Sequence, residues 1–175
     1  MSTTWNIDPA HSEVGFKIRH LMISNVKGHF GNYQSTLITE DENFDTAKVS
    51  FEAEVASIST DNEQRDAHLK AADFFDVETY PKITFNSTGV SKISEKEFLV
   101  TGDVTIKGIT RSIQLNVMQS GMAKDPWGQT KIAFEINGTI NRTDFGLVWN
   151  APLETGGVLL SEEVKLLMEV QFSKS

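Results

Sequence analysis

Residues 48–55 read KVSFEAEV, and this short stretch decides the fold class. Val49, Phe51 and Ala53 alternate with charged or polar residues. Successive side chains of a β-strand point to opposite faces, so a two-residue period is typical of a strand with one buried and one solvated face. Parallel strands are usually apolar on both faces, whereas antiparallel sheets often have one wet face. The stretch therefore predicts antiparallel β-structure.

The same alternation recurs along most of the chain. The apolar positions that follow it are Val14, Phe16 and Ile18; Ile83 and Phe85; Phe98, Val100, Val104 and Ile106; Ile113, Leu115 and Val117; Ile132, Phe134, Ile136 and Ile140; and Val164, Leu166, Met168, Val170 and Phe172. Turn signals separate these segments, at Asp8-Pro9, 40–43, 79–82, Lys107-Gly108, Asp125-Pro126 and Gly156-Gly157. Several long strands in one small domain predict an all-β barrel or sandwich.

The alternation changes phase once, in the segment VKGHFGNYQSTLIT. Val26 and Phe30 share a parity that Tyr33 and Leu37 do not share. A β-bulge inserts one extra residue and bends the strand, so the shift predicts a bulge near residues 31–32.

Composition limits the classes of protein that the chain can belong to. Its 175 residues suit a single domain over residues 1–175. The absence of cysteine excludes disulfides, thiol catalysis and thiolate metal sites. A net charge of −8 without a basic run predicts that neither nucleic acid nor an anionic membrane surface is a partner. No apolar stretch approaches the roughly 18 residues of a membrane span, and the first residues do not resemble a signal peptide, so we expect a cytoplasmic protein.

One stretch does not read as a strand. Residues 60–72 begin with a Thr60–Glu63 capping box, and acid-before-base pairs four residues apart follow. We therefore predict a helix over about residues 61–72. The paired residues are Asp61 with Arg65 and Asp66 with Lys70.

The apolar side of this predicted helix is thin. It consists of Leu69 and Ala72, and Phe74 and Phe75 follow directly. A narrow apolar stripe fits a helix that lies across the end of a barrel, with the phenylalanines entering the opening. The alternative is a crossover that only covers the core.

Several blocks together resemble one known family. They are WNIDPAHSEVGFKIRH at 5–20, GHFG at 28–31, RDAHL with DFFD in 65–76, YPKITF at 80–85, TIKGIT at 105–110, DPWG at 125–128 and NRTDFGLVWN at 141–150. In this order they resemble the YceI-like family of lipocalin-like, polyisoprenoid-binding proteins. The resemblance implies an eight-stranded antiparallel barrel with one inserted helix, and a long apolar pocket for an isoprenoid or other amphiphilic, fatty-acid-like lipid. It also allows a homodimer.

The interior of an eight-stranded barrel is either just filled by side chains or able to hold one small ligand. Gly102 and Gly138 have inward parity and would leave room, although a kink or bulge needed for closure is the alternative reading. A ring of inward phenylalanines beside such gaps would make a dry tunnel, although each one alone could be plain core. The predicted ligand-binding residues are Phe16, Ile18, His20, Phe30, Phe51, Phe75, Phe85, Phe98, Val100, Gly102, Leu115, Trp127, Phe134, Ile136, Gly138 and Trp149.

The polar and amphipathic members of this set have competing explanations. Trp127 and Trp149 lie beside turns, where tryptophan can rim the mouth of a pocket or simply pack under a loop. His20 ends a strand with inward parity, so it could bind a head group or be a structural histidine. Arg65 and His68 could also bind a head group, or they could tie the helix to the barrel.

The sequence contains no motif that indicates an enzyme. A nucleophile elbow, a phosphate-binding loop and HExxH are all absent, and the four histidines have no metal-ligand spacing. We therefore predict a lipid-binding protein, for storage or transport, without metal or cofactor. Two alternatives stay open: an enzyme that uses His20 and Asp144 on a hydrophobic substrate, and a solid structural barrel without a ligand. Arg142 and Asp144 are predicted to stabilise a turn as a pair.

Overall fold

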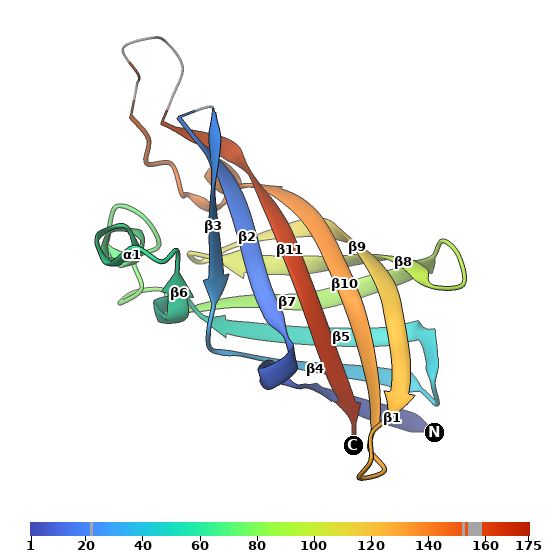
Figure 1. Cartoon of the computed structure of the whole chain (residues 1–175). Helices are drawn as coiled ribbons and strands as arrows, with labels where there is room; N and C mark the ends of the chain where they lie inside the picture. Colours follow the sequence, from blue (N-terminus) through green and yellow to red (C-terminus); the bar gives the residue numbers. More distant parts are fainter. Residues whose placement is uncertain (22, 152, 154–158) are drawn as a thin grey trace.

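A closed β-barrel forms the body of the protein (Figure 1). The computed structural model describes residues 1–21, 23–151, 153 and 159–175. Within these ranges eight antiparallel strands form a ring, which closes because the first strand pairs with the last. In ring order they are β1 (Ser2–Ile7), β4 (Tyr33–Glu40), β5 (Asn43–Glu54), β7 (Lys82–Lys92), β8 (Glu97–Ile106), β9 (Ile109–Lys124), β10 (Thr130–Asn141) and β11 (Leu160–Lys174). The predicted all-β, eight-stranded antiparallel barrel is confirmed.

Three further strands extend the wall at the end away from the chain termini. β2 (Glu13–His20) pairs with the first part of β11, β3 (Ser24–Phe30) pairs with β2, and the short β6 (Ile58–Ser59) pairs with β3. The predicted phase change lies between β3 and β4. However, a two-residue break at residues 31–32 produces it instead of a bulge, because the chain leaves β2 there and continues beside β1.

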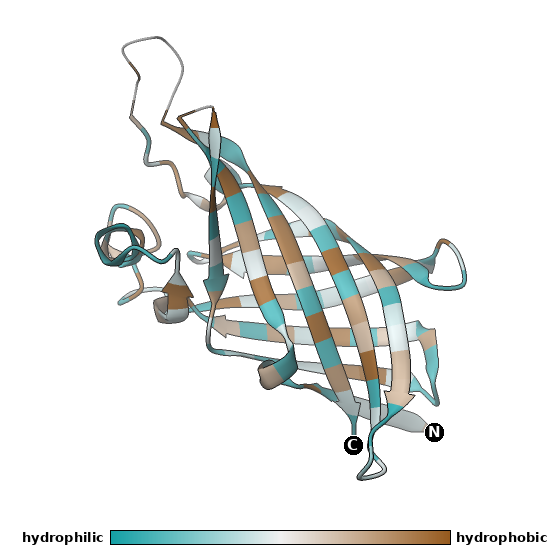
Figure 2. Cartoon of the chain, viewed as in Figure 1, coloured by the Kyte–Doolittle hydropathy of each residue, from teal (hydrophilic) through white to brown (hydrophobic). Residues whose placement is uncertain are grey.

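Hydropathy alternates along the strands, as Figure 2 shows for β2, β11 and β10. The predicted turn at Lys107-Gly108 joins β8 to β9 as a two-residue hairpin loop, in which both residues have positive φ. Such loops match the twist of the flanking strands. The turn predicted at residues 156–157 lies outside the described residues.

Apolar side chains seal the end of the barrel at which both termini emerge (Figure 1). Trp5 and Ile132 are fully buried there, and Phe44 packs between the rings of Trp5 and Phe134. The indole nitrogen of Trp5 donates to Thr39 Oγ1 at 3.2 Å. We call this the closed end.

The helix α1 (Glu63–Lys70) is shorter than predicted. Asn62, not Thr60, is its N-cap, because the Asn62 side chain accepts from the backbone N–H of Arg65 at 3.0 Å. The positive φ of Asp61 keeps that residue outside the helix. No helix within the described ranges is long and apolar enough to cross a membrane.

Thr60 is not the N-cap, but it connects the segment before the helix to side chains of α1. Asp66 Oδ1 accepts from the backbone N–H and the hydroxyl of Thr60, at 2.9 and 2.6 Å. Arg65 donates its Nε–H to the Thr60 hydroxyl at 2.7 Å. The predicted ion pairs of Arg65 with Asp61 and of Asp66 with Lys70 are absent from the described part of the chain, because Thr60 engages one residue of each.

Asp8 makes the stability of the barrel depend on pH. Its carboxylate accepts from the backbone N–H of Ala10 at 3.1 Å and meets His11 Nδ1 at 2.9 Å and Lys131 Nζ at 3.6 Å. The hydrogen bond from His11 is the main cause that lowers the pKa of Asp8 below 3.8, with Lys131 contributing. A pKa that is lower in the folded chain stabilises the fold above the ordinary value, and this contribution is lost as pH falls through the folded pKa.

We expect Asp8→Asn to lower the free energy of unfolding by about 1 kcal/mol at neutral pH. The difference from the parent should shrink as pH falls below 3.8, because the parent carboxylate then becomes protonated. Urea unfolding from pH 7 to pH 3 measures it, with the exposed Asp103→Asn as control. A gap that stays constant over this range would contradict the prediction.

Candidate functional site: an apolar cavity inside the barrel

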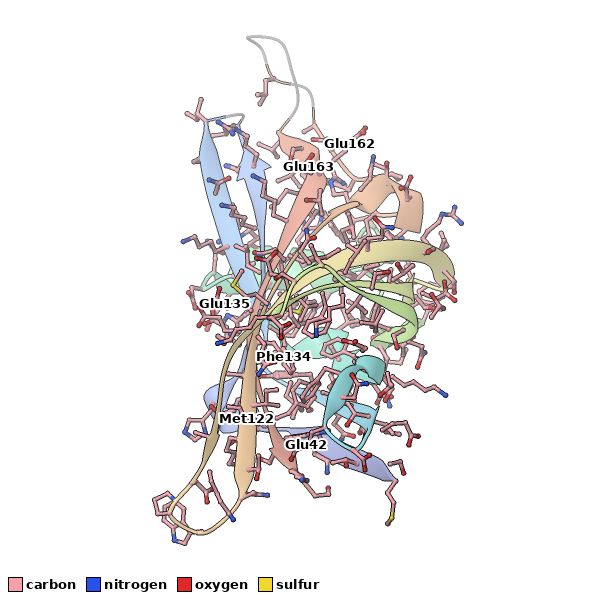
Figure 3. The ribbon with its side chains drawn as sticks, turned by 90° about the vertical axis from the view of Figure 1, so that its right-hand side faces the viewer. Glu42, Met122, Phe134, Glu135, Glu162 and Glu163 are labelled. Atoms are coloured by element: carbon pink, nitrogen blue, oxygen red, sulfur yellow. The ribbon has the colours of Figure 1, made fainter. Side chains whose placement is uncertain are left out.

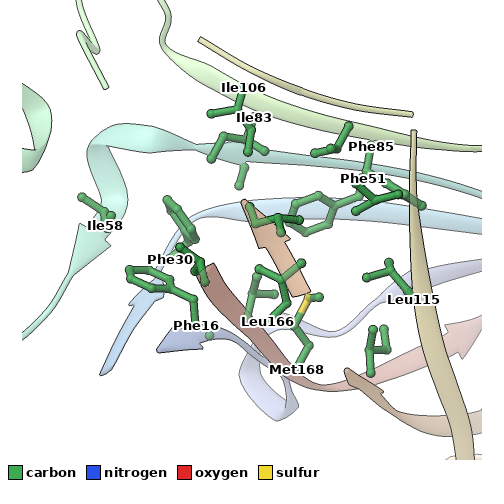
Figure 4. Close-up of a pocket in the computed structure, with 18 of the residues that line it drawn as sticks. Phe16, Phe30, Phe51, Ile58, Ile83, Phe85, Ile106, Leu115, Leu166 and Met168 are labelled. Atoms are coloured by element: carbon green, nitrogen blue, oxygen red, sulfur yellow. The ribbon is translucent and has the colours of Figure 1, made fainter. Parts of the chain in front are cut away.

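The barrel encloses a cavity of about 580 Å³. Each of the strands contributes side chains to its wall, together with α1 and the segments that follow α1 and β10. Figure 4 shows Phe16, Phe51, Leu166 and Met168 pointing from three strands into the same space. The volume lies within the range of cavities that hold a small molecule.

Inward side chains along the middle of the barrel are only partly buried. Phe16, Phe51, Ile136, Leu166 and Met168 all line the cavity, and each retains accessible surface although it points inward. Close-packed interiors bury such side chains completely. The alternative of a solid structural barrel therefore does not fit this interior.

Most of the predicted ligand-binding residues come together around the cavity. Those that line it are Phe16, Ile18, His20, Phe30, Phe51, Phe75, Phe85, Phe98, Val100, Leu115, Phe134, Ile136 and Trp149. Gly102, Gly138 and Trp127 are absent from its wall. Contact of the lining residues with a ligand remains a prediction.

The two inward glycines leave no open space, so this part of the interpretation is wrong. The Phe85 ring lies against Gly102, and a Cβ added at Gly138 would be 2.6 Å from Leu115 Cδ2. Gly28 accommodates the Phe16 ring in the same way. These glycines let a large neighbouring side chain lie flat against the wall, a known device in barrels. The cavity lies further inward, beyond those side chains.

Trp127 also lies away from the cavity. It is 88% exposed in the turn between β9 and β10, at the closed end. Asp125 holds this turn, because its carboxylate accepts from the backbone N–H groups of Trp127 and Gln129, both at 2.9 Å. The predicted position of Trp127 at the mouth is therefore wrong.

The opposite end of the cavity carries an aromatic cluster beside α1. The His68 ring meets the Trp149 ring edge-on at 4.6 Å between centroids and the Phe74 ring at 5.6 Å. Phe74 is buried and Phe75 is half-buried, and both line the cavity. We call this the helical end; α1 and the short helix η3 (Arg142–Phe145) mark it.

Arg142 lies buried at the helical end and is 2% exposed. Its Nε–H donates to the carbonyl of Ser161 at 2.8 Å, and Nη1 donates to the carbonyls of Leu147 and Trp149 at 2.6 and 2.9 Å. A longer contact of 3.5 Å joins Nη2 to the Leu160 carbonyl. One guanidinium thus ties the segment after η3 to the start of β11.

The predicted pair of Arg142 with Asp144 is wrong, because Asp144 is exposed and Arg142 points inward. The turn is stabilised by Asn141, which caps η3, and by the positive φ of Gly146. Burial lowers the pKa of Arg142, and Glu162 partly offsets this effect. The guanidinium nevertheless stays charged at neutral pH.

The chemistry of the cavity favours binding over catalysis. His20 lines the cavity, whereas Asp144 is exposed and does not, so the acid–base pair of the enzyme alternative is not assembled. In the described ranges, no three His, Asp or Glu side chains gather as metal ligands would. Apolar walls with a few polar groups at one end suit an amphiphile.

The chain is similar to known proteins over its whole length. A model described as the YceI-like domain matches residues 5–172. The UPF0312 proteins of Staphylococcus aureus strains MSSA476 and USA300 are 41% and 40% identical over 174 residues, covering 99% of each chain.

Solved structures show the same architecture. The Campylobacter jejuni YceI protein is 38% identical, with a TM-score of 0.77 and 94% of each chain covered. BcnA of Burkholderia cenocepacia has a TM-score of 0.82 at 20% identity, covering 94% of this chain and 98% of BcnA. A polyisoprenoid-binding domain from Saccharophagus degradans has a TM-score of 0.66 at 14% identity, with 96% and 97% covered. At these low identities the last two show the fold alone.

Proposed function

Because the chain belongs to the YceI-like family, we propose that it binds one long-chain isoprenoid or fatty-acid-like amphiphile in the barrel and stores or transports it. The observation that carries the proposal is the apolar cavity of about 580 Å³. The polyisoprenoid-binding neighbour from Saccharophagus degradans supports this class of ligand. A cytoplasmic location and a homodimer remain predictions.

The energetics of such binding depend on the apolar chain. Burial of one methylene contributes about 0.8 kcal/mol, so ten methylenes contribute roughly 8 kcal/mol before costs. Ordering a flexible chain and losing its translational freedom offset several kcal/mol of this. Polar groups and a longer chain then bring the affinity to the micromolar range or tighter. A small polar metabolite would gain none of this.

Non-denaturing mass spectrometry of freshly purified protein tests the proposal. We expect a co-purifying hydrophobic mass that is released unchanged, and rebinding of the extracted molecule at one per chain. A released molecule that differs chemically from the molecule added would favour the enzyme alternative. Failure to bind any long-chain amphiphile would contradict the proposal.

The helix α1 and the segment after it form a lid in this proposal. No residue of α1 is buried, and its aliphatic contact with the core comes from Leu69, with the following Phe74 and Phe75, while His68 packs against Trp149. Segments with few buried apolar contacts open at low free-energy cost. A bound molecule would therefore leave past this lid.

We expect Phe75→Asp to raise the dissociation rate of a bound amphiphile about tenfold. The half-buried ring would be replaced by a carboxylate that favours the open, hydrated position. Stopped-flow displacement, followed by the tryptophan fluorescence of the chain, measures the rate, because Trp149 lines the cavity. Phe75→Leu is the matched control and should change it less than threefold. An unchanged rate in a folded Phe75→Asp protein would show that the segment is only scaffold.

A further inference from the structure

We propose that the head group of the ligand is acidic, a carboxylate or a phosphate, and that it lies at the helical end beside Arg65 and Arg142. This inference rests on the proposed function, because it assumes that the cavity holds an amphiphile. It adds the charge of the ligand and its orientation.

The first argument is the sign of the charges around the cavity. Two arginines and two histidines line it, whereas none of its described lining residues is an aspartate or a glutamate. The whole chain has the opposite balance, with 24 Asp and Glu against 16 Lys and Arg. Acidic side chains such as Glu135, Glu162 and Glu163 lie exposed on the outer surface (Figure 3). The ionisable side chains that line the cavity are thus all basic, although the protein is acidic.

The second argument is that these basic residues lie at the same end. His20 pairs in register with Leu160, whose carbonyl is 3.5 Å from Arg142 Nη2. Arg142 Nη1 donates to the carbonyl of Trp149, and the Trp149 ring packs against His68. Arg65 lies one helical turn before His68. These links place the four basic residues at the helical end, where all of them line the cavity.

The third argument is that no acidic side chain of the described residues forms an ion pair with either guanidinium group, although the charge of Glu162 acts on Arg142 from further away. Arg142 donates only to backbone carbonyls, and Arg65 donates its side-chain N–H groups to Thr60 at 2.7 and 2.8 Å. No ion pair within the described residues involves either one. His68 does contact Asp73, at 3.0 Å, but Asp73 does not line the cavity.

An acidic head group would supply an anion in direct contact with these guanidinium groups. A buried charge without a partner is unfavourable, and guanidinium groups match the geometry of carboxylate and phosphate oxygens. The closed end is lined by apolar side chains, so the hydrocarbon tail points there and the head group stays with the arginines. A neutral alcohol of equal length would gain only the tail contacts.

Three probes with the same sixteen-carbon chain test the inference: palmitic acid, cetyl phosphate and cetyl alcohol. Affinity is measured for the full chain from its tryptophan fluorescence. We expect the acid, the phosphate or both to bind at least tenfold more tightly than the alcohol, because a charge-assisted hydrogen bond adds to the tail contacts. The ratio between acid and phosphate distinguishes the two kinds of head group.

Arg65→Gln should weaken binding of the preferred acidic probe about tenfold and change binding of the alcohol less than twofold. Arg65→Lys, which keeps the charge, should retain most of the preference. Lys17→Gln is the matched control, because it removes one positive charge from the outer face between the inward Phe16 and Ile18. It should change neither affinity, and circular dichroism checks the fold of each variant.

The outcomes distinguish failure of the acidic head group from failure of the proposed ligand binding in the cavity. Equal affinity of the parent for all three probes would overturn the acidic head group and leave the proposed function standing. Equal losses for acid and alcohol in Arg65→Gln would also overturn it. Failure of every probe to bind would overturn both proposals.

Discussion

Leu166→Trp is expected to weaken binding of a long-chain amphiphile by about a hundredfold while the barrel stays folded. Leu166 points into the cavity and is only partly buried, so the larger indole extends into open space. If it displaces about four methylenes of the ligand, at about 0.8 kcal/mol each, the loss is about 3 kcal/mol. This corresponds to roughly two orders of magnitude in the dissociation constant.

The neighbouring residue provides the control. Leu167 follows on the same strand, points outward and is 38% exposed, so Leu167→Trp makes the same substitution on the opposite face. It should leave binding within twofold of the parent. Urea unfolding of Leu166→Trp should show a change below about 1 kcal/mol, whereas overpacking of a solid core costs typically 1–3 kcal/mol. Tight binding by folded Leu166→Trp would contradict a ligand site in this space.

Arg142→Leu is expected to lower the free energy of unfolding by about 3–4 kcal/mol. The substitution leaves the carbonyls of Leu147, Trp149 and Ser161 without their donor, and each unsatisfied buried acceptor costs about 1–3 kcal/mol. For a chain of this length the midpoint of thermal unfolding should fall by roughly 10 °C. Thermal and urea unfolding measure the effect.

Two further variants show whether the hydrogen bonds are the cause. Arg111→Leu removes an exposed arginine and should change the stability by less than about 0.5 kcal/mol. Arg142→Lys keeps the charge but cannot reach three carbonyls at once, so its loss should be intermediate. A loss below about 1 kcal/mol in Arg142→Leu would show that other contacts hold the segment after η3.

The strands were predictable because each strand of a barrel has one wet and one dry face. Alternation around residues 48–55 therefore identified β-structure directly. The alternation could not predict closure into an eight-stranded barrel, because closure depends on the pairing of β1 with β11 at opposite ends of the chain. Only the resemblance to a family indicated it. The predicted start of α1 was wrong because Thr60 and Asn62 can both cap a helix. The positive φ of Asp61 keeps that residue out of the helix, so Asn62 is the N-cap.

Parity predicts the direction of a side chain but not what fills the space in front of it. Gly102 and Gly138 have inward parity, yet Phe85 and Leu115 occupy their space from neighbouring strands. Similarly, the sequence shows that Trp127 lies beside a turn but not at which end of the barrel that turn lies. Trp127 was therefore predicted at the wrong end.

The role of Arg142 could not be read from its own neighbourhood. Its acceptors include the carbonyl of Ser161, which is nineteen residues away. Local sequence offered only the nearby Asp144 as a partner. Buried cations that bind carbonyls leave no spacing signal, because every residue carries a carbonyl.

In the proposed function, the apolar cluster around Trp5 and Ile132 blocks the closed end, so a ligand would enter and leave at the helical end. An amphiphile that entered tail first would leave head first, so an acceptor would contact its polar group before its hydrocarbon chain. Release in this proposal would therefore reverse uptake and would not be a passage through the barrel. Since both termini emerge at the closed end, attachment of the protein to a bead or a sensor chip through either one keeps the helical end clear (Figure 1).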